Sequence, residues 1–180
     1  MLRRIATSLI ALVALLGGPT IAQDREPTGV KMLAPAGAIK PTGTWGLATR
    51  AGDFIFIAGM RGIDPMTHAL VAGEEARVRQ AFLNMKLIAE AEGASLRDAV
   101  RLVVYVTDMF RFRPIVNKVQ TELWGQGPYP PRTIVEVHRL NQDDIVEVEG
   151  TFYASTRIGA GAQSDAAPLP PNVSGGETRR

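Results

Sequence analysis

Apolar and polar residues follow one another along the chain in blocks that predict five strands and two helices. Two apolar blocks, 45–50 and 54–59, flank the Ala51-Gly52-Asp53 turn, a pattern that indicates two strands. Residues 74–92 carry apolar side chains at helical spacing and are followed by Gly93, which predicts a helix. Ser95, with Asp98 three residues later, resembles a capping box for a short turn.

The second half of the chain repeats this alternation of strand and helix. The β-branched run at 101–106 predicts a third strand. Pro114 suits the first turn of a second helix that ends at Gly125. Two further strands are expected near 132–139 and 145–154. The predicted order is β-β-α-β-α-β-β, an α+β protein with two helices on one face of a sheet.

The predicted strands at 54–57 and 102–105 are apolar on both faces of the sheet. Two helices can cover only one of these faces. The other face needs a partner, and a second copy of the chain is the simplest one. The sequence therefore predicts a homo-oligomer.

The two ends of the chain differ from this pattern. Residues 1–22 read as a signal peptide, with a basic start, a short apolar run and a small-x-small cleavage site before Gln23. Residues 23–41 are expected to form an extended lead-in, 42–155 the folded domain and 156–180 a disordered tail. These features predict a periplasmic or secreted protein with no stable membrane association after cleavage, although an uncleaved membrane anchor is the alternative.

The amino-acid composition excludes some kinds of functional site. Residues 1–22 hold two of the 20 Lys and Arg residues and none of the 18 Asp and Glu residues, so the mature chain has 18 of each. This neutral balance gives no support for nucleic-acid binding. The chain has no cysteine, and its two histidines, His68 and His138, lie far apart, so a thiol nucleophile is excluded and a zinc site is not expected.

The segment 128–150 carries the strongest candidate chemistry. Arg132 begins one predicted strand, where its planar guanidinium is suited to grip a carboxylate. Glu147 and Glu149 share one face of the next strand, and a carboxylate in an apolar strand costs free energy unless it is paired, hydrated or used. Together these residues predict a site that holds an acid-bearing substrate and positions a water. Structural ion pairs for Arg132 and Glu147 remain the alternative.

Residues 40–155 resemble the RidA/YjgF family of reactive-intermediate deaminases. The resemblance rests on an ordered set of short motifs: Ala58-Gly59, Ile63-Asp64-Pro65-Met66-Thr67, Gln80 with Asn84, Glu92-Gly93-Ala94-Ser95-Leu96-Arg97-Asp98-Ala99-Val100, Thr107-Asp108-Met109, Val116-Asn117, Pro130-Pro131-Arg132-Thr133 and Ile145-Val146-Glu147-Val148-Glu149. It implies a chorismate-mutase-like fold, a homotrimer with sites between subunits, and hydrolysis of imines and enamines to 2-oxo acids and ammonia without a metal or organic cofactor.

The same resemblance assigns roles by position. Arg132 matches the arginine that binds the substrate carboxylate, and Glu147 matches the acid that orients the attacking water. The expected substrate-binding residues are Trp45, Gly59, Met60, Asn117, Arg132 and Thr133. The chain departs from the family where a Ser-Gly-Gln motif reads Ala58-Gly59-Met60, with Arg61 adding a cation nearby. A non-catalytic binder of 2-oxo acids or amino acids is therefore a second hypothesis, and an endoribonuclease or translation inhibitor is a third.

Overall fold

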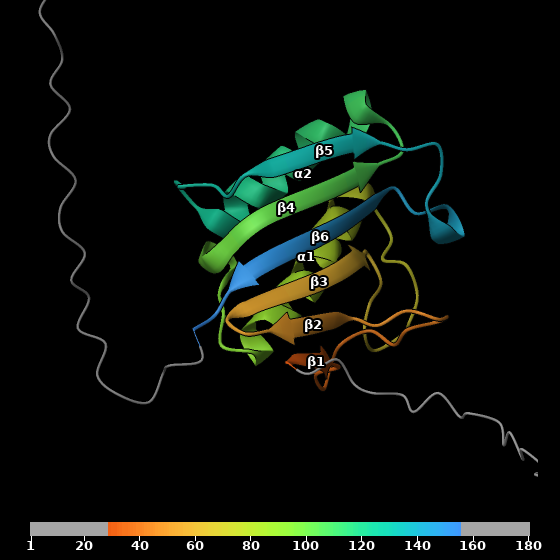
Figure 1. Ribbon diagram of the computed structural model, residues 1–180. Helices are drawn as coiled ribbons and strands as arrows, with labels where there is room; N and C mark the ends of the chain where they lie inside the picture. Colours follow the sequence, from red (N-terminus) through yellow and green to blue (C-terminus); the bar gives the residue numbers. More distant parts are fainter. Residues whose placement is uncertain (1–28, 156–180) are drawn as a thin grey trace, which may run out of the picture.

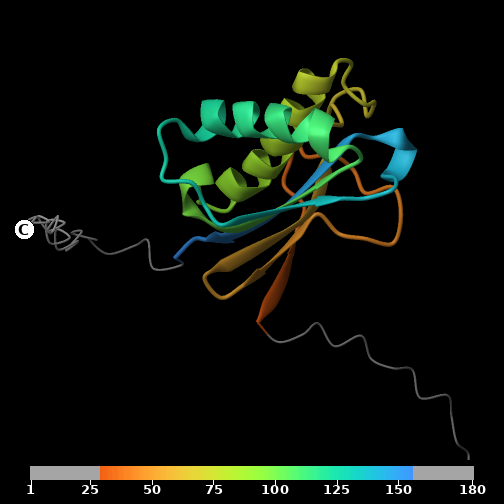
Figure 2. The ribbon, with the colours of Figure 1, turned by 90° about the horizontal axis from the view of Figure 1, so that it is seen from above.

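The computed structural model describes residues 29–155; the predicted signal peptide and C-terminal tail lie outside the described residues. These residues form one mixed sheet with two helices packed on one of its faces (Figure 1, Figure 2). The helices are α1 (Glu74–Ala91) and α2 (Met109–Trp124), with two 3-10 turns, η1 (Leu96–Asp98) and η2 (Asn141–Asp143). The strands are β1 (Val30–Leu33), β2 (Ala48–Ala51), β3 (Phe54–Arg61), β4 (Ala99–Val106), β5 (Arg132–Glu136) and β6 (Val146–Tyr153).

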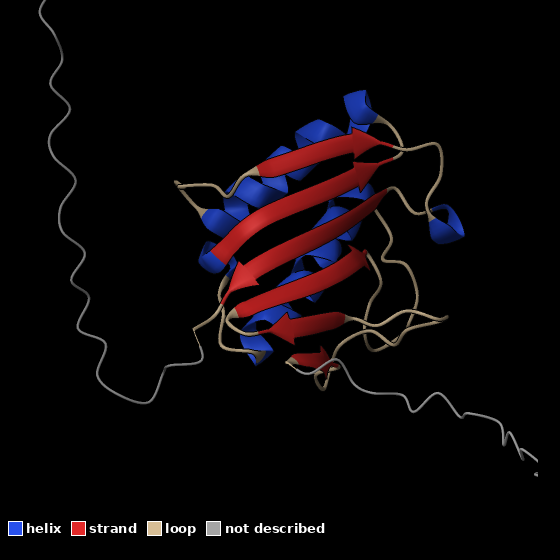
Figure 3. Ribbon diagram, viewed as in Figure 1, coloured by secondary structure: helices blue, strands red, loops and turns tan. Residues whose placement is uncertain are grey.

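The six strands lie in the order β1-β2-β3-β6-β4-β5 (Figure 3). All neighbours are antiparallel except β4 and β5, which are parallel because α2 crosses over between them. Although β5 and β6 follow one another in sequence, β4 lies between them. This arrangement confirms the predicted α+β class with both helices on one face.

The core lies between the sheet and the helices. On the inner face of the sheet, Ile55, Leu102 and Val148 are fully buried against α1 and α2, where Phe82 and Trp124 pack edge to face. The opposite face has no covering element among the described residues. Its large apolar side chains remain partly exposed: Met32, Phe54, Phe56, Val135 and Tyr153.

Local signals explain most element boundaries. Gly52 adopts a left-handed conformation (φ 58) in the tight turn between β2 and β3, and the Ser95–Asp98 capping box forms as predicted. The predicted start of the second helix at Pro114 is wrong. The helix begins at Met109 because the Asp108 side chain accepts a hydrogen bond from the Arg111 amide at 2.9 Å. Pro114 lies inside α2, in its second turn, at an exposed position.

The segment expected as an extended lead-in also contributes to the sheet. Residues 30–33 form β1, which pairs with β2 and places Leu33 opposite Ala48, with both side chains buried in the core. Part of the lead-in is thus a strand of the sheet. Its backbone groups are satisfied by pairing with β2, and a periodic pattern over four residues is too short to predict this pairing.

Candidate active site

Arg132 lies at the start of edge strand β5, and its side chain turns toward α2 on the helix-covered face. Nη1 donates to Gln120 Oε1 at 2.5 Å and Nη2 donates to Asn117 Oδ1 at 2.7 Å. Asn117 and Gln120 are three residues apart on α2, so both amides reach the same guanidinium. These two acceptors fix the direction of the arginine.

The positive charge of Arg132 has no acidic partner in the part of the chain that the structure describes. No carboxylate within residues 29–155 forms an ion pair with it, and burial, followed by the nearby Arg113 charge, lowers its pKa from the ordinary arginine value. It borders a cavity of about 430 Å³. A half-buried, uncompensated guanidinium beside a cavity is a suitable binding group for an anion, and its planar fork fits a carboxylate.

Glu147 lies on β6 and points to the other face of the sheet. Its carboxylate lies over Gly59 of β3, where a Cβ atom would come within 1.8 Å of Glu147 Oε1. Glycine is therefore required at position 59 for this close approach. Glu147 and Gly59 border a smaller cavity of about 200 Å³, together with Trp45 and Arg61.

The Glu147 carboxylate is half-buried and has no hydrogen bond or ion pair with any other residue in 29–155. Burial raises its pKa above the ordinary glutamate value; the Arg61 charge opposes this shift, while Glu149 and Asp144 add to it. A carboxylate with free lone pairs and raised basicity can accept a proton from a water molecule or a bound substrate.

Within one chain, Arg132 and Glu147 cannot act on the same small molecule. Arg132 pairs with Leu102 on β4 and Glu147 pairs with Tyr105, three residues further along and on the opposite face. Strand geometry puts their Cα atoms about 14 Å apart, with side chains directed away from one another. The chain therefore presents two half-sites.

The structure distributes the sequence-predicted residues between these half-sites. Asn117 lies with Arg132, and Trp45 and Gly59 lie with Glu147. Thr133 borders neither; it lines the wide cavity of about 710 Å³ on the open face. The prediction that the Met60 side chain contacts the substrate is wrong. Its side chain is 0% exposed and belongs to the core, so no more than its backbone could reach a ligand.

Two residues near the half-sites were missed by sequence analysis. Gln120 is 5% exposed and orients Arg132; a polar residue on the otherwise apolar stripe of α2 was the available signal. Asp144 is buried immediately before β6 and accepts from the amides of Ile145 at 2.7 Å and Gly62 at 3.3 Å. Burial raises the pKa of Asp144 despite these hydrogen bonds.

No group of three or more His, Cys, Asp and Glu side chains within residues 29–155 could hold a metal ion. Across the same residues, no helix combines the length and apolar character needed to cross a membrane.

The fold and half-sites define a small α+β protein that presents a half-buried arginine and a half-buried glutamate. The model of the endoribonuclease L-PSP family matches residues 36–154, more than half of the chain. The chain therefore belongs to this family, that of the RidA and YjgF proteins.

Individual relatives agree with this assignment. A RutC family protein of Pyrococcus horikoshii is 42% identical over 117 residues, which cover 64% of this chain and 91% of that protein. A 2-iminobutanoate/2-iminopropanoate deaminase of Dermatophagoides farinae is 33% identical over 113 residues, 62% of this chain and 87% of that protein. The structure of a probable translation initiation inhibitor from Rhodopseudomonas palustris is 56% identical, with a TM-score of 0.68, and the match covers 69% of this chain and 98% of that one.

Proposed function

We propose that this protein is an exported imine deaminase that hydrolyses carboxylate-bearing imines and enamines to 2-oxo acids and ammonia. The observation that carries the proposal is the pair of unsatisfied charges. Arg132 is a half-buried cation without an acidic partner, and Glu147 is a half-buried carboxylate without a donor, among residues 29–155. A relative named 2-iminobutanoate/2-iminopropanoate deaminase supports the reaction class.

The two half-sites require a second copy of the chain to become one site. Arg132 and Asn117 of one subunit would face Trp45, Gly59 and Glu147 of its neighbour, in a homotrimer. The uncovered apolar face of the sheet, with Phe56 46% exposed, supplies a surface for such assembly. A head-to-tail contact that closes after three copies gives three equivalent sites.

The reaction asks little of the protein beyond positioning. A protonated imine is already electrophilic at carbon, so Arg132 holds the substrate carboxylate and fixes the imine carbon near a water. Glu147 accepts a proton as the water oxygen bonds to that carbon, giving a carbinolamine. Glu147 then gives the proton to nitrogen, the C–N bond breaks, and the carbinolamine hydroxyl loses its own proton to the departing ammonia as the 2-oxo acid forms. Water is the single co-reactant.

Single substitutions test the proposed roles. The assay measures ammonia release by the mature protein from 2-iminopropanoate generated in place by an amino-acid oxidase. Arg132→Ala removes charge-assisted hydrogen bonds worth about 1.5 kcal/mol or more each, so kcat/KM should fall about 100-fold. Arg132→Lys should recover little, because an ammonium cannot reproduce the planar fork.

Glu147→Gln keeps the shape but loses the base, and should lower kcat more than it raises KM. Glu149→Gln is the matched control two residues along the same face of β6, and its rate at neutral pH should stay near wild type, because losing the Glu149 charge favours the ionised form of Glu147. Wild-type rates in both Arg132→Ala and Glu147→Gln, with folded oligomers, would overturn the proposed mechanism.

A non-catalytic role in binding 2-oxo acids is the second candidate. The observation that favours it is the loss of two polar groups beside Gly59, since Ala58 has no hydroxyl and the Met60 side chain is buried. Binding of 2-oxobutanoate by calorimetry, without ammonia release from any imine in the assay, would support this candidate over the deaminase.

A further inference from the structure

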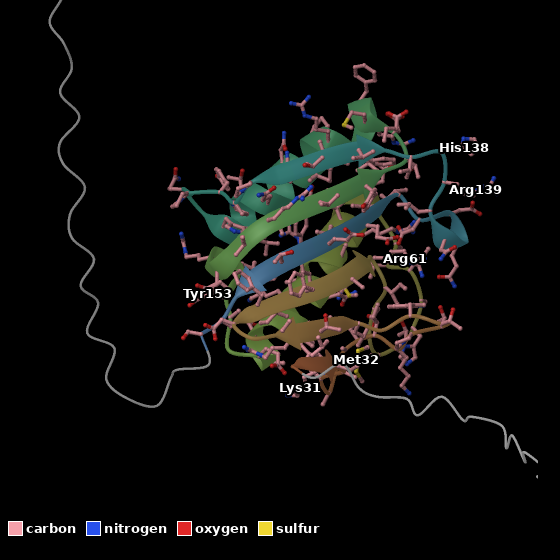
Figure 4. All side chains as sticks on the ribbon, in the orientation of Figure 1. Lys31, Met32, Arg61, His138, Arg139 and Tyr153 are labelled. Atoms are coloured by element: carbon pink, nitrogen blue, oxygen red, sulfur yellow. The ribbon has the colours of Figure 1, made fainter. Side chains whose placement is uncertain are left out.

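Arg61 is a buried cation at the Glu147 half-site that the proposed mechanism does not use. It ends β3 directly opposite Glu147 of β6, and both residues line the cavity of about 200 Å³. Figure 4 shows Arg61 at the end of β3, on the side of the molecule where the loop carrying Arg139 turns back toward β6. The Arg61 residue is 7% exposed, which is unusual for a charged residue.

Hydrogen bonds fix Arg61 at both of its ends. Nη1 donates to the Asn141 carbonyl at 2.6 Å and Nη2 donates to Gln142 Oε1 at 3.1 Å. At the other end, its backbone carbonyl accepts from Asn84 Nδ2 at 2.9 Å. The backbone of Gln142 adopts a left-handed conformation (φ 57) that residues other than glycine rarely take. The Arg61 guanidinium therefore binds the η2 loop in an uncommon backbone geometry.

These hydrogen bonds also keep the guanidinium from pairing directly with the acids around it. No carboxylate in residues 29–155 lies within 4.0 Å of an Arg61 nitrogen, although its charge opposes the rise that burial causes in the pKa of both Glu147 and Asp144. A direct ion pair would occupy the lone pairs of Glu147. Because Arg61 forms no direct ion pair with Glu147, its charge stabilises the carboxylate while the lone pairs of Glu147 stay free for water.

We propose that Arg61 is a positioning residue for Glu147: anchored to the η2 loop, it keeps a positive charge beside the carboxylate and so maintains the ionised, proton-accepting form at neutral pH. This inference rests on the proposed function of Glu147 as the base. It gives a role to Arg61, which directly follows Ala58-Gly59-Met60, where the serine and glutamine of the family motif are replaced.

The surroundings of Glu147 show why such a cation is needed. Glu149 on the same strand and Asp144 just before it both favour protonation of Glu147, and Tyr105 pairs with it in the register of β4. Burial acts in the same direction. Arg61 is the one positive group among these neighbours in the described chain, so its removal should raise the Glu147 pKa further and leave less carboxylate at pH 7.

The experiment combines two measurements on the mature protein. Carbon-13 NMR follows the titration of the Glu147 carboxyl, and the pH dependence of kcat/KM is measured with 2-iminopropanoate. Arg61→Gln keeps a donor for the η2 loop but removes the charge. Its Glu147 titration and the acid limb of its rate profile should both move to higher pH, and kcat/KM at neutral pH should fall about tenfold and recover as the pH rises.

Two variants separate charge from structure. Arg61→Lys retains the cation, so its acid limb should lie close to that of wild type. Gln142→Ala removes one hydrogen bond of the loop anchor but keeps the Arg61 charge, and should not move the acid limb either.

An unchanged Glu147 titration in folded Arg61→Gln would overturn the proposal. A loss of activity that is equal at every pH would do the same, because it would indicate a purely structural role. If the wild type releases no ammonia, the proposed function fails, yet the NMR titrations of Arg61→Gln and Arg61→Lys still decide the effect of Arg61 on Glu147.

Discussion

Mixing two inactive variants should restore activity, because the geometry separates Arg132 and Glu147 within one chain. Their Cα atoms are offset by three residues along β4 and by two strand spacings, about 14 Å in all, and their side chains leave opposite faces of the sheet. A small imino acid cannot bridge that distance through a packed sheet. We therefore expect a working site to take each residue from a different subunit.

The perturbation is the pair Arg132→Ala and Glu147→Gln, each expected to be nearly inactive alone. The two variants are unfolded together in equal amounts and refolded, so that subunits mix at random. In a cyclic trimer, a site is intact when the first subunit retains Arg132 and the second retains Glu147. About one quarter of all sites should meet both conditions.

The assay is ammonia release at matched protein concentration, with each variant refolded alone as the control. Recovery near one quarter of the refolded wild-type rate supports sites shared between subunits. If both residues served one chain, no mixed assembly would contain an intact site and the rate would stay at the level of the separate variants. That outcome, with mixing verified by mass spectrometry of intact oligomers, would refute the inter-subunit site.

Three further predictions concern the glutamate pocket, assembly and export. Gly59→Ala should lower kcat/KM by at least about tenfold with little change in thermal stability, because its Cβ would displace the mobile end of Glu147 rather than backbone; wild-type activity in a folded variant would contradict this. Phe56→Asp should give a folded, inactive monomer by light scattering, whereas Phe110→Asp, at a residue 94% exposed on α2, should leave the oligomer intact. A stable wild-type monomer would count against the assembly. N-terminal sequencing of protein exported by its host should begin at Gln23, and an intact Met1 would argue against cleavage.

Local chemistry was sufficient to predict much of the fold. The left-handed turn at Gly52 and the Ser95–Asp98 capping box depend on a few adjacent residues, so the sequence identifies them directly. Strand alternation likewise places Glu147 and Glu149 on one face of β6, as the structure confirms. Arg132 and Glu147 stand out from the sequence because charged residues in apolar strands need an explanation.

Other features depended on contacts between distant segments. The insertion of β4 between β5 and β6 separates Arg132 from Glu147, and no pattern within 128–150 indicates it. The pairing of β1 with β2 could not be predicted from the sequence either, because a four-residue edge strand is stabilised by its partner strand.

Met60 shows most clearly what could not be predicted from the sequence. Simple alternation from Ile55 and Ile57 would put Met60 on the open face, beside Glu147. The register of β3 against β6 instead shifts between Ile57 and Met60, because a bulge adds one residue to β3. A one-residue shift exchanges the two faces, so Met60 enters the core and Arg61 takes the place at the pocket. The sequence predicted the strand over 54–59, but pairing with β6 extended it to Arg61 and decided which of its residues reaches the site.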